Sequence, residues 1–131
     1  MSFEGKIALV TGASRGIGHA ITMELAAHGA IVIGTATSEA GAQHISQDLA
    51  TVRPDAGKGI VLNVADADRS REVIDEIQKE YGAIHILINN AGITQDQLAM
   101  RMKDEDWDKV IDVNLTAVAR LSRGVLRGMM K

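Results

Sequence analysis

The feature that most constrains this fold is a regular alternation of short apolar runs with longer segments of helical periodicity. Four runs have the length and composition of buried strands: residues 6–11, 30–34, 59–64 and 84–88. Four segments repeat apolar residues at helical spacing: residues 16–28, 38–50, 66–82 and 104–131. This alternation indicates a parallel sheet covered by helices on both faces. We therefore expect an α/β fold with a doubly wound parallel sheet of four strands, and right-handed crossovers leave few strand orders to consider.

Composition narrows the classes of protein further. The chain has 131 residues, of which 46% are hydrophobic and 24% charged, as expected for one globular domain. It has no cysteine, which excludes disulfides and thiolate chemistry, and a net charge of -3, which gives no basic footprint for nucleic acid. No apolar run is long enough to span a bilayer, and the N-terminus lacks the features of a signal peptide. A soluble cytoplasmic protein is the expectation.

A glycine-rich turn follows the first predicted strand. It comprises Gly12, Ala13, Ser14, Arg15, Gly16, Ile17 and Gly18. Gly12 permits a tight turn, Gly16 lets the backbone approach a pyrophosphate, and Gly18 allows close packing of helix and strand. Three glycines also fit a plain turn, but the position before a helix N-terminus favours a nucleotide site. No Lys-Ser/Thr pair follows, which argues against a P-loop.

The glycine spacing, together with Asn89-Asn90-Ala91-Gly92 after the fourth strand, resembles the short-chain dehydrogenase/reductase family along the whole chain. That resemblance implies a Rossmann-like fold, with the four strands in the order 3-2-1-4. Three segments, at residues 3–18, 34–39 and 99–107, are similar to the 3-oxoacyl-(acyl-carrier-protein) reductases of bacterial fatty-acid synthesis. The resemblance implies NADPH-dependent reduction of a 3-oxoacyl thioester on acyl-carrier protein to the 3-hydroxyacyl form, in a homotetramer.

The end of the second predicted strand bears on the choice of cofactor. Enzymes of this fold that prefer NAD place Asp or Glu there, on the ribose 2′-hydroxyl, whereas this chain has Ala36. Arg15 and the Thr37 hydroxyl can donate hydrogen bonds to a 2′-phosphate. Glu39 is the alternative candidate for the missing acid. We expect NADP(H) rather than NAD.

Other cofactor contacts are implied by the resemblance. It places Asn63 and Val64 beside the adenine, where many relatives have Asp in place of Asn63. It also places three residues along the cofactor ribose: Asn90, Ala91 and Gly92. For Asn89, backbone hydrogen bonding that holds the loop is the preferred interpretation.

Asn114 interrupts the apolar pattern of the last predicted helix. A buried Asn can simply be a satisfied core residue, but the resemblance assigns Asn114 to a catalytic tetrad, where it holds a water for proton relay. The other tetrad members are Ser and a Tyr-x-x-x-Lys pair. The single tyrosine, Tyr81, is followed four residues later by His85 and lies on an apolar helix face, so we interpret it as core.

The apolar surface of the last predicted helix and the edge of the fourth strand indicate that this chain associates. The apolar residues of the helix cover more than the face needed to sit on a sheet: Trp107, Val110, Ile111, Leu115, Val118, Leu121, Val125, Leu126 and Met129. The outer edge of the strand at residues 84–88 lacks a predicted partner. We therefore expect that the isolated chain associates with other copies through this helix, aggregates, or is stable only beside a further half of the domain.

The preferred interpretation is that residues 1–131 form the dinucleotide-binding half of one domain and are inactive alone, the catalytic half being absent. One alternative is a complete non-catalytic nucleotide-binding or regulatory module. A flavodoxin-like or receiver-like domain is disfavoured because the strand ends lack an acidic cluster. His19, His28 and His44 show no ligand spacing, so we expect solvated histidines and no metal site.

Overall fold

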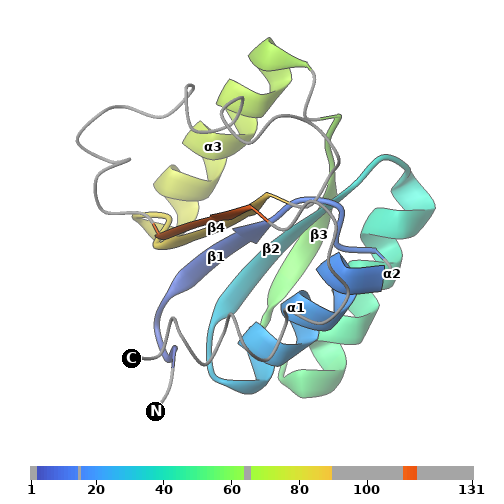
Figure 1. The fold of residues 1–131 in the computed structure, drawn as a ribbon, viewed down its shortest axis with the longest axis vertical. Helices are drawn as coiled ribbons and strands as arrows, with labels where there is room; N and C mark the ends of the chain where they lie inside the picture. Colours follow the sequence, from blue (N-terminus) through green and yellow to red (C-terminus); the bar gives the residue numbers. More distant parts are fainter. Residues whose placement is uncertain (1–2, 15, 64–65, 90–110, 115–131) are drawn as a thin grey trace.

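The computed structural model describes residues 3–14, 16–63, 66–89 and 111–114, which form a parallel sheet with helices on both faces (Figure 1). The strands are β1 (Ile7–Val10), β2 (Ile31–Ala36), β3 (Gly57–Val61), β4 (Ile86–Asn89) and β5 (Ile111–Asn114). The helices are α1 (Gly16–Ala27), α2 (Glu39–Val52) and α3 (Ala67–Tyr81). The sheet order is β3-β2-β1-β4-β5, and every pairing is parallel. The predicted α/β class and the order of the first four strands are confirmed.

Strand β5 corrects the prediction of one continuous helix over residues 104–131. Residues Ile111–Asn114 are paired with β4, with Ile111 opposite Ile86 and Val113 opposite Ile88. The sequence Ile-Asp-Val-Asn alternates apolar and polar residues and contains two β-branched side chains, which favours a strand. Pairing also satisfies backbone groups of β4 that an open edge would leave exposed, so the predicted open edge is wrong as well. The rest of that segment lies outside the described residues.

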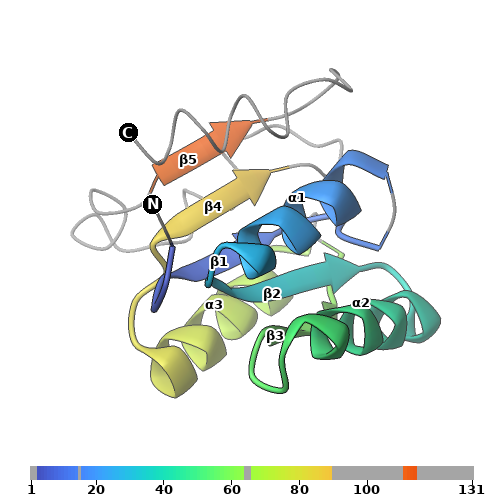
Figure 2. The same cartoon turned by 90° about the horizontal axis from the view of Figure 1, so that it is seen from below.

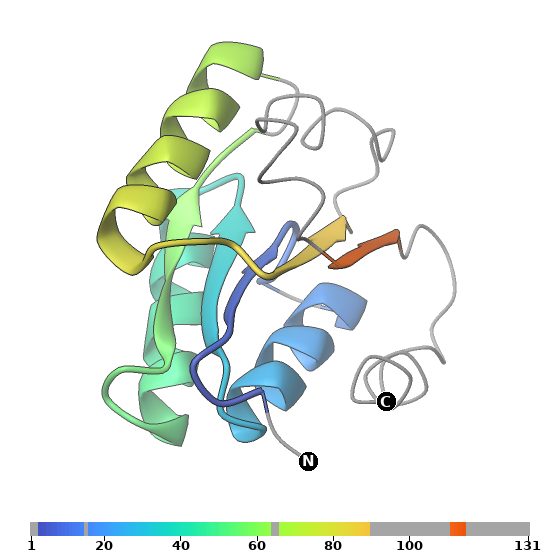
Figure 3. The same cartoon turned by 90° about the vertical axis from the view of Figure 1, so that its left-hand side faces the viewer.

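The two faces of the sheet are covered by different helices. Helices α1 and α2 lie on one face and α3 on the other (Figures 2 and 3). Residues along β1 alternate between these layers, with Ala8 and Val10 in one core cluster and Ile7 and Leu9 in the other. The larger buried residues of the α1/α2 cluster are Ile21, Leu25, Val32, Ile45, Leu49, Ile86 and Ile88. Those of the α3 cluster are Ile33, Leu62, Val73, Ile74, Ile77, Ile84 and Leu87.

Helix ends follow the capping residues in the sequence. The Ser38 hydroxyl accepts a hydrogen bond from the Gly41 N–H at 3.1 Å and caps α2, and the Asp66 carboxylate accepts from the Arg69 N–H at 3.1 Å and caps α3. Helix α3 ends at Gly82, whose φ of 97° is in the region that favours glycine. These helix boundaries confirm the predicted ones to within two residues.

Arg53, in the loop after α2, holds the ends of two helices together. Its guanidinium donates to the carbonyl oxygens of Ala26 at 2.8 Å, Gly29 at 3.0 Å and Ala30 at 2.6 Å. These bonds join the end of α2 to the segment that follows α1, and they give the carbonyls of Gly29 and Ala30 a hydrogen-bond partner.

Gly59 allows α2 to approach β3 closely. A side-chain carbon at this position would overlap the carbonyl oxygen of Ala42 and lie 2.8 Å from the Cβ of Ile45. The Gly59 N–H instead donates to the Ser46 hydroxyl at 2.8 Å. Helix and strand can therefore pack this tightly only because position 59 has no side chain.

Candidate nucleotide-binding site

The candidate site lies at the carboxyl ends of the strands, where the order of the sheet reverses direction. From β1 the chain continues to β2 and β3 on one side of the sheet, and then to β4 and β5 on the other. In open α/β sheets, ligands bind in the crevice outside the carboxyl ends of the strands at such a switch point. The loop that leaves β1 at this point is the glycine-rich turn.

Hydrogen bonds from both neighbouring strands hold the glycine-rich turn. The Thr11 N–H and hydroxyl donate to the carbonyl of Ile88 at 3.0 and 3.3 Å. The Gly12 N–H donates to the Thr35 hydroxyl at 3.2 Å, and the Ala13 N–H to the Thr35 carbonyl at 2.8 Å. The turn is thus positioned by β2 and β4 before any ligand arrives.

The glycines give the turn the shape that an anion needs. Gly12 and Gly16 have φ angles of 62° and 63°, which side chains rarely allow. None of the described residues would lie within 4 Å of a Cβ at Gly16, so within that part of the structure the space beside the first residue of α1 is open. Gly18 is buried, and the first turn of α1 contains no acidic residue. Free N–H groups, the helix dipole and this opening together fit the pyrophosphate of a dinucleotide.

The end of β2 carries no carboxylate. Ala36 is its last residue and only 5% exposed, within the α1/α2 core cluster. Its methyl group lies so close to Gly41 that a Cβ there would meet it at 2.8 Å. Thr37, directly after the strand, is exposed, and so is Glu39 in the first turn of α2. The position that can face a ligand is therefore Thr37, while Ala36 faces the core.

The remaining predicted site residues are only partly described. Asn63 is exposed between β3 and α3, and its carbonyl accepts a hydrogen bond from the Asp66 N–H at 2.9 Å. Asn89 ends β4 and Asn114 ends β5, and the two are partners in register. Asn114 therefore lies at the carboxyl edge of the sheet and not within a helix. The other predicted site residues lie outside the described residues: Arg15, Val64, Asn90, Ala91 and Gly92.

Tyr81 is partly buried on the side of α3 that faces the core, and its raised pKa makes it a poor proton donor. It packs against the α3 cluster. Burial, together with a hydrogen bond to the neighbouring Glu80, raises the pKa of Tyr81 to about 12. Four residues later, His85 Nδ1 accepts a hydrogen bond from the Ile7 N–H at 3.0 Å. Tyr81 is thus partly buried against the core and does not lie fully within it, as the interpretation from the sequence had it.

The structure corrects the interpretation of two histidines that the sequence analysis took to have no ligand spacing. His19 and His44 both lie within hydrogen-bonding distance of Asp48, so the conclusion that they have no ligand spacing is wrong. Part of this signal is in the sequence, since His44 and Asp48 are four residues apart on one helix face. His19 comes from a different helix, and only the packing of α1 on α2 brings it there.

The class of protein follows from comparison with known families. Residues 6–131 match the model of the short chain dehydrogenase family, and the chain belongs to that family. It is 60% identical to the 3-oxoacyl-[acyl-carrier-protein] reductase FabG of Escherichia coli (strain K12), 57% to that of Vibrio harveyi and 50% to that of Pseudomonas aeruginosa, over 131 residues in each case. All of this chain is covered, but only 52%, 52% and 53% of these relatives. The chain thus spans about half their length.

Within the part of the chain that the structure describes, no helix is both long enough and apolar enough to cross a bilayer.

Proposed function

We propose that this chain is the dinucleotide-binding half of an NADPH-dependent reductase that converts 3-oxoacyl-(acyl-carrier-protein) to the 3-hydroxyacyl form. The observation that carries the proposal is the open glycine-rich turn at the switch point of the sheet, with space beside Gly16 at the start of α1. The choice of substrate is supported by 50–60% identity to reductases with this printed activity over the whole chain.

The residues of this chain have separate parts in holding the cofactor. The turn from Gly12 to Gly18 surrounds the pyrophosphate, with the N–H groups at the start of α1 as its donors, and Arg15 and Thr37 donate to the 2′-phosphate. Asn63 and Val64 border the adenine. Asn90, Ala91 and Gly92 line the ribose at the end of β4. When bound, the nicotinamide supplies the hydride for reduction of the ketone.

The proton chemistry needs residues beyond these. A Ser that stabilises the oxyanion and a Tyr-x-x-x-Lys pair that donates the proton are supplied, in this proposal, by a further segment of the longer protein. Asn114 holds the water of the proton relay. Tyr81 takes no part, because its pKa is raised to about 12 and no lysine follows it at the required spacing. The intact protein acts as a homotetramer on its carrier-linked substrate.

Cofactor preference is tested at Thr37 in the full-length protein. Thr37→Asp places a carboxylate at the exposed end of β2, and like charges a few ångströms apart near a protein surface repel by more than about 1.4 kcal/mol. We expect NADPH affinity to fall at least about tenfold relative to NADH, as measured by fluorescence titration. Thr37→Asn introduces a neutral side chain of the same shape as Asp. It should leave the ratio of NADPH to NADH affinity within about threefold of that of the unmodified protein.

Ala36→Asp, the obvious alternative, is a poorer test because it would also bury a carboxylate beside Gly41. Equal affinity of the unmodified protein for NADPH and NADH would contradict the cofactor proposal.

The substrate and the division of the protein are tested by turnover. The full-length protein should oxidise NADPH in the presence of a 3-oxoacyl thioester on acyl-carrier protein, whereas residues 1–131 alone should not exceed background. Turnover by material whose intact mass matches the calculated 14.0 kDa would contradict the proposed division. Sedimentation of the full-length protein as a monomer would contradict the homotetramer.

A further inference from the structure

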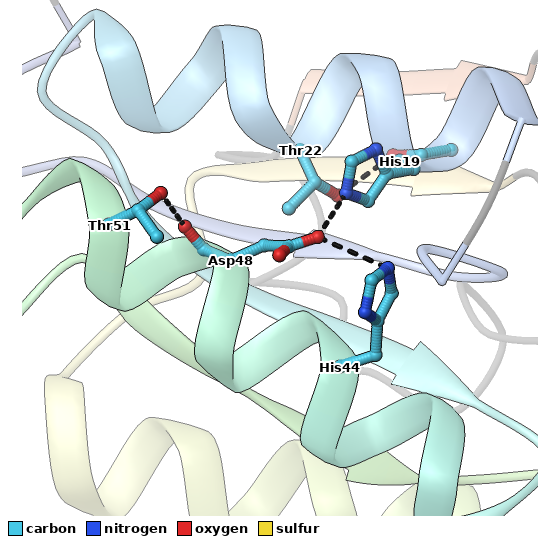
Figure 4. A network of polar contacts seen from close by, with 6 residues as sticks. His19, Thr22, His44, Asp48 and Thr51 are labelled. Carbon is cyan, nitrogen blue, oxygen red and sulfur yellow. Dashed lines mark hydrogen bonds and ion pairs between the residues drawn. The ribbon is translucent and has the colours of Figure 1, made fainter.

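Three side chains that the nucleotide site does not use converge between α1 and α2 (Figure 4). His19 extends from α1, and His44 and Asp48 extend from α2. The Nε2 atoms of His19 and His44 lie 2.7 and 3.2 Å from the same oxygen, Oδ2 of Asp48. The two imidazole rings are stacked with centroids 5.8 Å apart and planes inclined by 19°.

The packing of the helices creates this cluster. His44 and Asp48 are one turn apart on α2 and therefore share a face, and α1 packs across that face with His19 directed toward it (Figure 4). The side chains of His19 and Asp48 are 31% and 29% exposed, and that of His44 is 55% exposed. The cluster is thus held in place on one side and open to solvent on the other.

Nearby hydroxyl groups leave the ligand atoms available. The Thr51 hydroxyl donates to the backbone carbonyl of Asp48 at 2.6 Å, and the Thr22 hydroxyl to that of Gly18 at 2.8 Å. Both hydroxyls are therefore engaged with backbone. The carboxylate of Asp48 faces the two imidazoles.

We propose that His19, His44 and Asp48 form a binding site for a divalent transition-metal ion, with Zn²⁺ as the representative ion. Two imidazoles and one carboxylate are ligands that Zn²⁺ accepts, and three protein ligands leave a fourth position for water. The three ligand atoms lie within 4.8 Å of one another, whereas ligands about 2.1 Å from a tetrahedral ion lie about 3.4 Å apart. Only small side-chain movements separate the two arrangements.

The charge of the site suits this occupant. Two neutral imidazoles and one carboxylate give a net charge of −1 facing a dication, and binding requires both Nε2 atoms to be free of protons. Mg²⁺ prefers oxygen ligands in octahedral geometry, which this set does not supply. A bound ion would link the first turns of α1, directly after Gly18, to the middle of α2.

The experiment uses full-length, tag-free protein and Zn²⁺ alone as the probe. Equilibrium dialysis should show a saturable Zn²⁺ site in each chain, which lies in this cluster if substitutions here weaken it. Each of three variants should weaken Zn²⁺ binding: His19→Gln, His44→Gln and Asp48→Asn. The loss should exceed the roughly tenfold effect of changing a residue that only hydrogen-bonds to a metal ligand. His44→Gln is the least disruptive to the fold, because that side chain is 55% exposed.

His28→Gln is the matched control. His28 also lies on the α1 side of the molecule and has a carboxylate, Glu24 Oε1, 4.0 Å away, but it belongs to no group of three possible metal ligands among the described residues. The control should retain Zn²⁺ binding within about twofold, and Mg²⁺ should not compete. Thermal unfolding should show a Zn²⁺-dependent rise in Tm that the three cluster variants lose and His28→Gln keeps.

Three outcomes overturn the proposal: no saturable binding, binding that survives His44→Gln, or binding that is lost in His28→Gln. Crystals soaked in Zn²⁺ with an anomalous peak elsewhere and none between α1 and α2 would also overturn it. None of these outcomes depends on reductase activity, so the metal site and the proposed function stand or fall separately.

Discussion

The helices on the two faces of the sheet all pack against it, but their sequences differ strongly in the number of charged residues. More than half of the residues of α3 are charged, and all of its buried core residues lie on one side: Val73, Ile74 and Ile77. Helix α1 carries one carboxylate, Glu24, and no lysine or arginine. Helix α3 packs on one face of the sheet (Figure 2), whereas α1 contacts both the sheet and α2 on the other face.

This difference explains on which side of the sheet the candidate binding residues lie. The charged side chains of α3 point into solvent, where pairs such as Arg69 with Glu72 at 3.3 Å contribute little. On the α1/α2 face, α1 has few charged side chains, and packing brings its His19 to His44 and Asp48 of α2. The glycine-rich turn and the His19–His44–Asp48 cluster both lie on this second face.

The largest expected contrast is between Gly59 and Glu76. Gly59→Ala places a carbon against the Ala42 carbonyl between α2 and β3, and we expect a loss of about 2–3 kcal/mol in the free energy of unfolding. Glu76→Ala on the outer surface of α3 should change it by less than about 0.5 kcal/mol. Urea denaturation of both variants measures the difference. Equal effects would show that the two layers do not differ in tightness.

The next contrast compares two arginines. Arg53→Lys removes the planar fork that serves three backbone carbonyls, and we expect a loss of about 2 kcal/mol. Arg69→Lys affects only exposed pairs on α3 and should cost less than about 0.5 kcal/mol. Thermal unfolding in low and high salt tests both. A strong salt dependence of the Arg53 effect would argue against its assignment to backbone bonds.

A smaller effect is expected at the N-caps, where the two layers should behave alike. Ser38→Ala on α2 and Asp66→Ala on α3 each remove one hydrogen bond to a helix N–H, at a cost of about 1 kcal/mol. The Asp66 effect should shrink at high salt because that cap is charged. Chemical denaturation at two salt concentrations provides the measurement, and the reverse salt pattern would contradict the assignment.

The smallest effect concerns pH at the end of α3. Burial, and to a lesser extent the charge of Lys6, lowers the pKa of His85 from its ordinary value of 6.5. The unfolded chain therefore binds more protons than the fold between the two values, so stability is full above pH 6.5 and falls as pH drops toward the lowered pKa. His85→Asn keeps an acceptor for the Ile7 N–H without titrating. This variant should flatten the profile of Tm against pH below 6.5, and an unchanged slope would contradict the assignment.

Most of the fold could be predicted because its signals are local. Period-two and helical patterns, the caps Ser38 and Asp66, and the stop at Gly82 each act within a few residues. The strand at Ile111–Asn114 was missed because its neighbours continue a helical pattern, and four residues cannot show that β4 requires a partner. The glycine-rich turn was found because its spacing is itself the signal, while its contacts with Thr35 and Ile88 depend on strands distant in sequence.

The sequence by itself determined the layered α/β class and the position of the glycine-rich turn, since each depends on neighbours along the chain, and the resemblance to a known family supplied the order of the first four strands. Tertiary structure alone decided that Ala36 faces the core, that Arg53 joins two helix ends and that His19 meets His44 and Asp48. The physical reason is distance along the chain. Contacts between residues tens of positions apart arise only when helices, strands and loops pack together in the fold, and no local pattern in the sequence records that packing.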